Sequence, residues 1–285
     1  MSVELIWKTS KRTIDLAQTP RVMGILNVTP DSFSDGGKFF STDDALWQAE
    51  RLIDEGADIL DIGGESTRPG SLRVSAYDEI ARVVPVIEAI TSRYEIPVSI
   101  DTTKSDVAAA ALDAGAEIIN DISGMRFDEG IADVAAAAGA GLVLMHSRGG
   151  FETLHSQPPV EDIMADVAAD FCRSTAAALE HGVGAGQIVL DIGIGFGKTL
   201  EQNLELIAKL DKLIAEFPEY PMLVGTSRKS FIGKILDDTP PDQRLSGSLA
   251  TAAIAVWNGA TVLRVHDVKE TVAATTVLEA IRQRK

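Results

Sequence analysis

The chain has 285 residues, of which 45% are hydrophobic and 24% charged, as is typical of a globular protein with one large domain or two small ones. Its net charge of −16 argues against binding to nucleic acid or to an anionic membrane surface, because phosphate groups attract clustered Lys and Arg. The single cysteine, Cys172, excludes an internal disulfide and favours a reducing cytoplasm, and with neither a signal pattern nor an apolar run of ~18 residues we expect no membrane span.

The first regular structure is predicted between Ile6 and Leu16, where two short alternating stretches suggest a hairpin. We expect residues 1–20 to form this hairpin as an N-terminal extension and residues 21–285 to form one catalytic domain. Within that domain Cys172 falls in a helical pattern, and we expect it to be packed in the core or partly buried.

From Arg21 onward, short apolar segments alternate with helical ones. Eight segments have the composition of buried parallel strands: residues 22–26, 59–62, 98–100, 118–119, 142–144, 188–190, 222–224 and 261–263. Ser41 with Asp44, and Ser75 with Asp78, have the spacing of capping pairs that begin helices. We expect Pro85 to kink or shorten the second of these helices. The later predicted helices are residues 161–180, 204–217, 246–257 and 268–282.

Eight strand–helix units without an internal linker predict an α/β protein, a single (β/α)8 TIM barrel with a short N-terminal hairpin. A doubly wound open sheet is the alternative. That fold normally places a GxGxxG phosphate loop after its first strand, and this chain has none there.

Polar residues occupy or follow nearly every predicted strand end. They are Asn27, Asp61, Asp101, Asn120, Asp191, Lys229, Arg264 and His266; the apolar Met145 follows the fifth predicted strand. Any one of them alone would be ordinary turn chemistry. In a barrel, however, all eight ends converge on one face, where strand-end residues are usually catalytic. Asp61 lies within an apolar run, and a buried carboxylate costs several kcal/mol, on the order of a lost charge pair, so we expect the fold to supply a partner for it.

The converging groups are of two kinds. Carboxylates and the amide of Asn120 suit a flat heterocycle that presents adjacent N–H donors. The residues 227–230, with Arg264 and His266, supply cations and donors after the last two strands, where barrels commonly bind phosphate. Asn27 and the loop of residues 29–35 could add hard oxygen ligands for Mg²⁺.

Motifs along nearly the whole chain resemble the dihydropteroate synthase family of folate biosynthesis. They are NVTPDSFSDGG (27–37), DIGGESTRPG (61–70), DTTK (101–104), IND (119–121), DIGIGFGK (191–198), SRKSFIG (227–233), RLSGSLA (244–250) and RVHD (264–267). The resemblance implies a barrel enzyme that joins (7,8-dihydropterin-6-yl)methyl diphosphate to p-aminobenzoate and releases diphosphate. It also implies Mg²⁺ as cofactor, sensitivity of the family to sulfonamides, and a cytoplasmic homodimer.

The resemblance assigns roles by position. Asp101, Asn120, Asp191 and Lys229 would hold the pterin, whereas Asn27, as the metal ligand, would hold diphosphate together with Arg264 and His266. Thr67, Arg68, Phe33 and Ser34 would lie on loops that cover the reacting centre, and Phe196, Lys229 and Ser230 would border the p-aminobenzoate pocket. Asp101, Lys229, Arg264 and His266 are the expected catalytic residues. The expected substrate-binding residues are Phe33, Ser34, Asp61, Thr67, Arg68, Asp101, Asn120, Met145, Asp191, Phe196, Gly225, Ser227, Lys229, Ser230, Arg264, Val265 and His266.

Two positions depart from the family pattern. Ile192 replaces the proline that often follows the strand-six aspartate, and residues 147–150 replace a Gly-x-Pro turn after His146. The first concerns the rigidity of the loop after strand six and the second concerns the roof over the pterin.

Three other functions share part of this pattern. A methyltetrahydrofolate-binding barrel would use the same pterin carboxylates but not the cations of residues 227–230. A class I aldolase would use Lys229 as a Schiff-base amine, which needs an apolar site rather than the flanking Arg228 and serines. A non-catalytic pterin-binding module would leave the cations without a role.

Overall fold

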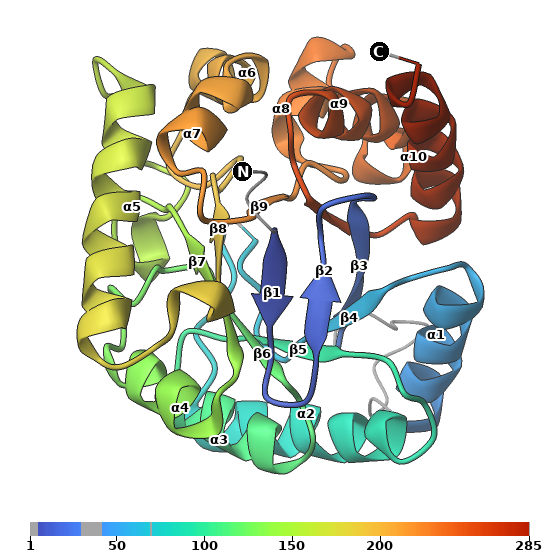
Figure 1. The fold of residues 1–285 in the computed structure, drawn as a ribbon, viewed down its shortest axis with the longest axis vertical. Helices are drawn as coiled ribbons and strands as arrows, with labels where there is room; N and C mark the ends of the chain where they lie inside the picture. Colours follow the sequence, from blue (N-terminus) through green and yellow to red (C-terminus); the bar gives the residue numbers. More distant parts are fainter. Residues whose placement is uncertain (1–4, 30–41, 69, 285) are drawn as a thin grey trace.

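The computed structural model describes residues 5–29, 42–68 and 70–284 of the chain. Eight parallel strands close into a barrel in the order β10-β3-β4-β5-β6-β7-β8-β9 (Figure 1). They are β3 (Arg21–Asn27), β4 (Ile59–Gly63), β5 (Val98–Asp101), β6 (Ile118–Asp121), β7 (Gly141–Met145), β8 (Ile188–Asp191), β9 (Met222–Val224) and β10 (Val262–Val265). The predicted (β/α)8 barrel is therefore confirmed.

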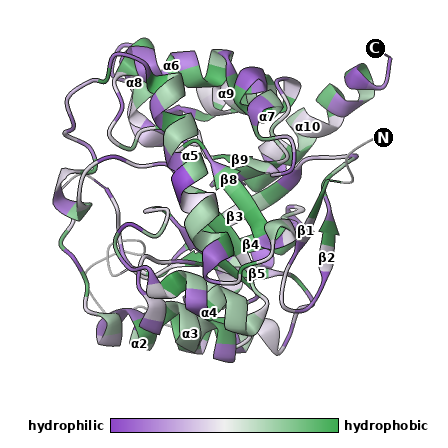
Figure 2. Cartoon of the chain, turned by 60° about the vertical axis from the view of Figure 1, so that its left-hand side comes forward, coloured by the Kyte–Doolittle hydropathy of each residue, from purple (hydrophilic) through white to green (hydrophobic). Residues whose placement is uncertain are grey.

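The α-helices surround the barrel. They are α1 (Thr42–Asp54), α2 (Ala76–Thr91), α3 (Ser105–Asp113), α4 (Gly130–Ala138), α5 (Ile163–Glu180), α6 (Leu200–Ala208), α7 (Leu210–Glu216), α8 (Ser230–Ile235), α9 (Leu245–Trp257) and α10 (Val268–Arg282). Short 3-10 turns are η2 (Phe151–Thr153), η3 (Ala185–Gln187) and η4 (Pro241–Gln243). Figure 2 shows the barrel strands as hydrophobic and the helices as two-sided, which is the pattern of a parallel sheet covered by amphipathic helices. In the described part of the chain, no helix combines the length and apolarity that crossing a membrane requires.

The predicted hairpin is present as β1 (Ile6–Lys8) and β2 (Thr13–Asp15). Trp7 is completely buried and packs with Met23, Ile59 and other residues that line the N-terminal ends of the barrel strands. Its indole Nε1 donates to the carbonyl oxygen of Gln187 at 2.8 Å. Position 141 must be glycine, because a Cβ there would lie 2.8 Å from the indole nitrogen. The hairpin thus closes the bottom of the barrel and leaves the carboxyl ends of the strands as the open face.

Helix α2 does not end early at Pro85, so the predicted shortening is wrong. Ser75 caps the helix by accepting a hydrogen bond from the backbone N–H of Asp78 at 3.1 Å, as its spacing predicted. An internal proline costs about 3 kcal/mol in a helix. Burial of side chains on both sides of the proline, including Val83 and Ile87, offsets that cost against the barrel.

Two further expectations about helices are corrected. The single helix predicted for residues 204–217 is divided at Lys209, whose backbone (φ −110°, ψ 19°) ends α6 and begins α7. Cys172 is exposed, because the buried face of α5 passes through its neighbour Phe171, and the next residue points about 100° away. A hydrophobic residue type in a helical pattern was therefore not enough to place Cys172 in the core.

Candidate active site

Four strand-end side chains meet inside the open face of the barrel. The guanidinium of Arg264, on β10, donates from Nε to Asp61 Oδ2 at 2.6 Å and from Nη2 to Asp101 Oδ2 at 2.5 Å. Asn120 Nδ2 donates to the same oxygen of Asp61 at 3.1 Å. Asp61 is fully buried, and its other oxygen has no partner among the described residues. The partner that we expected for Asp61 is therefore Arg264, assisted by Asn120.

In this cluster, burial and the neighbouring charges shift the pKa values of the side chains in opposite directions. Burial raises the pKa of Asp101 to about 7 even though the charge of Arg264 lowers it. Burial also lowers the pKa of Arg264, but Asp61 and Asp101 outweigh burial and raise it above its ordinary value. The guanidinium is therefore a permanent cation, whereas Asp101 changes charge near neutral pH. Asp101 is therefore the member of the cluster through which the affinity of the site for a ligand should respond to pH.

Lys229, after β9, and Asp191, at the end of β8, extend the site. Desolvation and the nearby charge of Arg264 lower the pKa of Lys229 to about 8. Its ammonium lies 4.1 Å from the ring centroid of Phe196, which is a cation–π contact. Burial raises the pKa of Asp191, although this carboxylate accepts a hydrogen bond from the N–H of Gly193 at 2.8 Å. The ammonium and the carboxylate together offer one donor and one acceptor group to a ligand.

His266 follows β10 and lies against Ser227. The Ser227 hydroxyl oxygen accepts the backbone N–H of His266 at 3.1 Å and also lies 3.1 Å from Nδ1. Burial, aided by Arg228 and Arg264, lowers the pKa of His266 to about 3, so the ring is neutral at physiological pH. If the hydroxyl donates to Nδ1, the proton lies on Nε2, and the neutral ring still presents an N–H donor.

The remaining expected residues differ in what they can offer to a ligand. Gly225 places its backbone beside Arg264, whose Cβ would lie 3.7 Å from an added Cβ. Ser230 is exposed at the first position of α8. Val265 and Met145 are 4% and 3% exposed, and Val265 belongs to the hydrophobic core. Val265 can therefore reach a ligand only through its main chain.

The loops after β4, β7 and β8 border this site, and we call them the β4 loop (residues 64–68 and 70–75), the β7 loop (residues 146–162) and the β8 loop (residues 192–199). Thr67 and Arg68 lie in the β4 loop. Phe33 and Ser34, the other two residues expected on a covering loop, lie outside the described residues.

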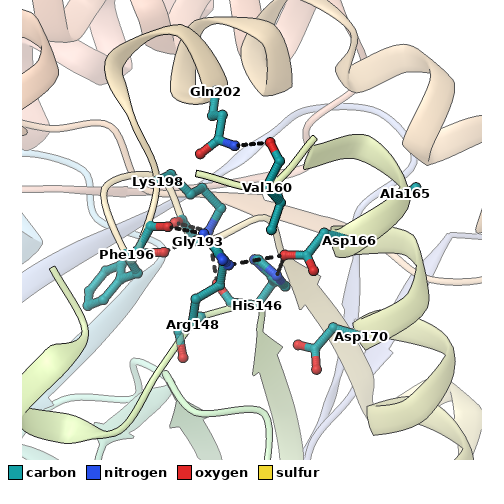
Figure 3. Close-up of polar contacts among 12 residues, drawn as sticks. His146, Arg148, Val160, Ala165, Asp166, Asp170, Gly193, Phe196, Lys198 and Gln202 are labelled. Carbon is teal, nitrogen blue, oxygen red and sulfur yellow. Dashed lines mark hydrogen bonds and ion pairs between the residues drawn. The ribbon is translucent and has the colours of Figure 1, made fainter. Parts of the chain in front are cut away.

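Sequence reasoning overlooked Lys198, which organises the β8 loop (Figure 3). Its ammonium donates to the carbonyl oxygens of His146, Gly193 and Phe196 at 3.2, 2.7 and 3.1 Å. Gly193 is required here, because its φ is +61° and an added Cβ would lie 1.8 Å from the oxygen of His146. The loop is thus held without a proline after Asp191, since Ile192 is fully buried in the core. A lysine directly after alternating glycines was the signal that could have revealed this role.

Lys104, in the DTTK motif, holds the base of the β4 loop. Its ammonium lies 3.0 Å from Glu65 Oε2 and 2.5 Å from Glu79 Oε2. Glu65 in turn accepts the N–H of Val74 at 2.5 Å. Burial raises the pKa of Glu79 in spite of the lysine beside it. Lys104 therefore fixes the start of the loop that carries Thr67.

Asn27, expected to bind Mg²⁺, is half-buried at the end of β3. The described residues contain no group of three or more His, Cys, Asp or Glu side chains arranged to hold a metal ion. A single amide oxygen does not make a metal cage. It does fit a Mg²⁺ ion that takes most of its ligands from substrate phosphate and water.

The chain is similar to known proteins over nearly its whole length. Residues 23–266 match the family described as "Pterin binding enzyme". The dihydropteroate synthase of Escherichia coli K12 is 47% identical over 270 residues, covering 94% of this chain and 93% of the relative, and that of Bacillus subtilis 168 is 45% identical. A crystal structure of Yersinia pestis dihydropteroate synthase with a sulfonamide superposes with a TM-score of 0.91 at 44% identity, over 98% of this chain and 99% of that one. The structure of Burkholderia cenocepacia dihydropteroate synthase in complex with 7,8-dihydropteroate superposes with a TM-score of 0.87 at 40% identity, over 98% of this chain and 97% of that one. The chain therefore belongs to the dihydropteroate synthase family of pterin-binding enzymes.

Proposed function

We propose how the groups at the barrel mouth carry out the reaction of this family. The chain is a transferase that condenses (7,8-dihydropterin-6-yl)methyl diphosphate with p-aminobenzoate to give 7,8-dihydropteroate and diphosphate. The observation that carries the assignment of residues is the buried cluster of Asp61, Asp101, Asn120 and Arg264 at the strand ends. It combines acceptors for a heterocycle with a cation for an anionic leaving group.

The pterin is held by the deep half of the site. Asp101, Asn120 and Asp191 supply acceptors for the ring N–H and amino donors, and Lys229 supplies a donor for the ring carbonyl oxygen. The burial of these residues supports this assignment. Asp191 is 5% and Asn120 2% exposed, so a bound ring has only a small area to cover to exclude water from them. Charged hydrogen bonds of this kind contribute about 1.5–3 kcal/mol each.

The diphosphate is held by the outer half of the site. Arg264 and the Nε2–H of His266 face the leaving group, and Asn27 would hold a Mg²⁺ ion bound mainly to diphosphate oxygens. When bound there, Mg²⁺ supplies charge neutralisation of the leaving group. Arg264 pairs with Asp61 and Asp101 through Nε and Nη2, so its third nitrogen, Nη1, can contact diphosphate while both pairs stay intact.

Catalysis then depends on charge stabilisation rather than on a covalent enzyme intermediate. Loss of diphosphate leaves an electron-deficient exocyclic carbon, and the carboxylates nearby stabilise the positive charge that spreads into the dihydropterin. The aryl amine of p-aminobenzoate attacks that carbon, its proton passing to solvent or to the departing diphosphate. Phe196 and the β4 loop exclude water that would otherwise trap the cation.

The reaction is tested by incubating the purified chain with both substrates and Mg²⁺. We expect dihydropteroate and diphosphate to appear in equal amounts, each requiring both substrates. Lys229, with its lowered pKa, could also form a Schiff base, as an aldolase requires. Borohydride trapping of labelled carbonyl compounds on the chain would support that alternative, and we expect none.

Binding of p-aminobenzoate is expected to be coupled to diphosphate. The part of the site that would bind p-aminobenzoate, which we call the acceptor half, draws on long loops. Ordering a loop costs roughly 1–2 kcal/mol per residue, and bound diphosphate can supply that ordering. Titration calorimetry should show p-aminobenzoate, and sulfonamides that imitate it, binding at least about tenfold more tightly with saturating diphosphate and Mg²⁺. Equal affinities with and without diphosphate would show that this half of the site is preformed.

A homodimer in the cytoplasm completes the proposal. Neighbouring helices α6, α9 and α10 expose large apolar side chains, among them Leu204 at 41%, Ile254 at 48% and Val277 at 62%. Adjacent exposed apolar residues on several helices are typical of an interface between copies. The Ile254→Glu substitution should therefore shift the mass measured by light scattering from dimer to monomer. Tyr77→Glu, which changes an 81% exposed residue on α2, should leave the dimer intact.

A further inference from the structure

The β7 and β8 loops are joined into one unit beside the active site (Figure 3). Arg148 Nη1 donates to the carbonyl oxygens of Pro158 at 2.7 Å and Gly197 at 2.9 Å. Gln202, in the first turn of α6 directly after the β8 loop, donates from Nε2 to the carbonyl oxygen of Val160 at 2.9 Å. A movement of one loop therefore carries the other with it.

His155, in the β7 loop, connects this unit to the β4 loop. Its Nε2 lies 2.7 Å from the carbonyl oxygen of Thr67, and its Nδ1 lies 3.1 Å from the carbonyl oxygen of Gly195. Both partners can only accept, so the neutral ring donates to one of them and the protonated ring to both. The neighbouring Leu154 is 1% exposed and anchors the turn in a cluster with Met145. The main chain that carries the imidazole is thus anchored by the buried side chain of Leu154.

The same ring packs on the residue that borders the acceptor half of the site. The ring centroids of His155 and Phe196 are 5.4 Å apart, with an interplanar angle of 34°. The ammonium of Lys229 lies 4.1 Å from the centroid of Phe196. His155 therefore contacts both the Phe196 ring and the main chain of Thr67 without being part of the pterin cluster.

A second contact fastens the same two loops. The guanidinium of Arg73, in the β4 loop, lies 5.3 Å from the ring centroid of Phe151 and 5.7 Å from that of Phe127. Phe151 belongs to the β7 loop, and Phe127 follows β6. The β4 and β7 loops therefore meet at two separate places, His155 with Thr67 and Phe151 with Arg73. Two contacts at different parts of the β4 loop indicate a built connection rather than a chance approach of surface side chains.

We propose that His155 is a positioning residue for p-aminobenzoate, which clasps the β4 loop to the β7–β8 unit and so sets the distance between Thr67 and Phe196. The proposal rests on the proposed placement of p-aminobenzoate between these residues. Because His155 is exposed and its contacts are with Thr67, Gly195 and Phe196, it acts on the acceptor half of the site and not on the pterin half. Its loss should change affinity for one substrate only.

Steady-state kinetics of His155→Phe test this selectivity. Phenylalanine keeps a ring against Phe196 but removes the hydrogen bonding of the imidazole to the two carbonyl oxygens; the neutral ring makes one such bond, worth about 1 kcal/mol. We expect the KM for p-aminobenzoate to rise roughly five- to tenfold, while kcat and the KM for the pterin diphosphate stay within about twofold. His155→Gln, which restores one donor, should recover part of the difference. An unchanged KM for p-aminobenzoate in His155→Phe, or a parallel loss in all three constants, would overturn the proposal.

Limited trypsin digestion tests the clasp without any assay of activity. The β4 loop offers trypsin the bond after Arg73, whereas Arg68 is followed by proline in the sequence and is resistant. Mass spectrometry should show faster cleavage after Arg73 in His155→Phe than in the unmodified chain. The matched control is His181→Phe. His181 follows the C-terminal end of α5, far along the chain from the β7 loop, and its ring is hydrogen-bonded to Asp133. Equal cleavage in all three proteins would refute the clasp, whatever the outcome for p-aminobenzoate.

Discussion

Replacing Asp101 by asparagine is expected to weaken pterin binding by roughly ten- to a hundredfold, because a charged acceptor of N–H donors contributes about 1.5–3 kcal/mol. Calorimetry with a pterin that lacks diphosphate measures the change directly. Asparagine has nearly the same shape, and Asp61 still neutralises Arg264, so the fold should survive. The expected control is Asp78→Asn at the exposed start of α2, which should leave pterin affinity unchanged.

The pH dependence of the same titration identifies the group responsible. Burial raises the pKa of Asp101 to about 7, so the carboxylate gains a proton as the pH falls through that value. Pterin affinity of the unmodified chain should therefore decline as the pH falls from 8 to about 6. In Asp101→Asn this dependence should disappear. A pH dependence that persists in the variant would mean that another group, such as Asp191, controls pterin binding.

Much of the fold was predictable because its signals are local. Strands that are buried on both faces appear as short apolar runs, and eight such runs with helical segments between them leave few architectures. Lys209 shows where local signals end, since the residues around it keep a helical period although the helix breaks there. Which of two adjacent helical residues faces the core, as with Phe171 and Cys172, depends on the rotation of α5 against the barrel.

The pairing inside the site was not predictable in the same way. The sequence marked Asp61 as a buried carboxylate in need of a partner, but Arg264 is 203 residues away in the chain. Barrel closure brings the two together, because β10 pairs with β3 and β3 pairs with β4. The roles of Lys198 and His155 depend on loop conformations. The glycines before Lys198 were a signal of its role, whereas no residue type marks the two carbonyl oxygens that His155 contacts. The roles assigned to Phe33 and Ser34 stay predictions.

Arg264 has the largest expected effect on diphosphate binding, because it is the permanent cation that we place against the leaving group. Removing one partner of a buried charge pair between protein and ligand costs about 2–5 kcal/mol, so Arg264→Ala should weaken binding of the dihydropterin diphosphate by roughly thirtyfold or more. The variant also loses the charge that lowers the pKa of Asp101, so more of this carboxyl group will be protonated at neutral pH. Some loss of affinity is therefore expected for any pterin.

Comparing two ligands at pH 8.5 separates these effects, because Asp101 is then more fully ionised. The pterin diphosphate should lose at least about tenfold more affinity than the corresponding hydroxymethyl pterin, which has no anion for Arg264 to contact. Arg264→Lys keeps a cation but loses the planar fork that pairs Nε with Asp61 and Nη2 with Asp101, and it should retain an intermediate preference for diphosphate if Arg264→Ala does not fold. Arg282→Ala, at the exposed end of α10, is the control for loss of an arginine. If both ligands weaken equally in the Arg264 variants, the guanidinium serves the pterin or the fold, and the diphosphate must be held by His266 and the other donors.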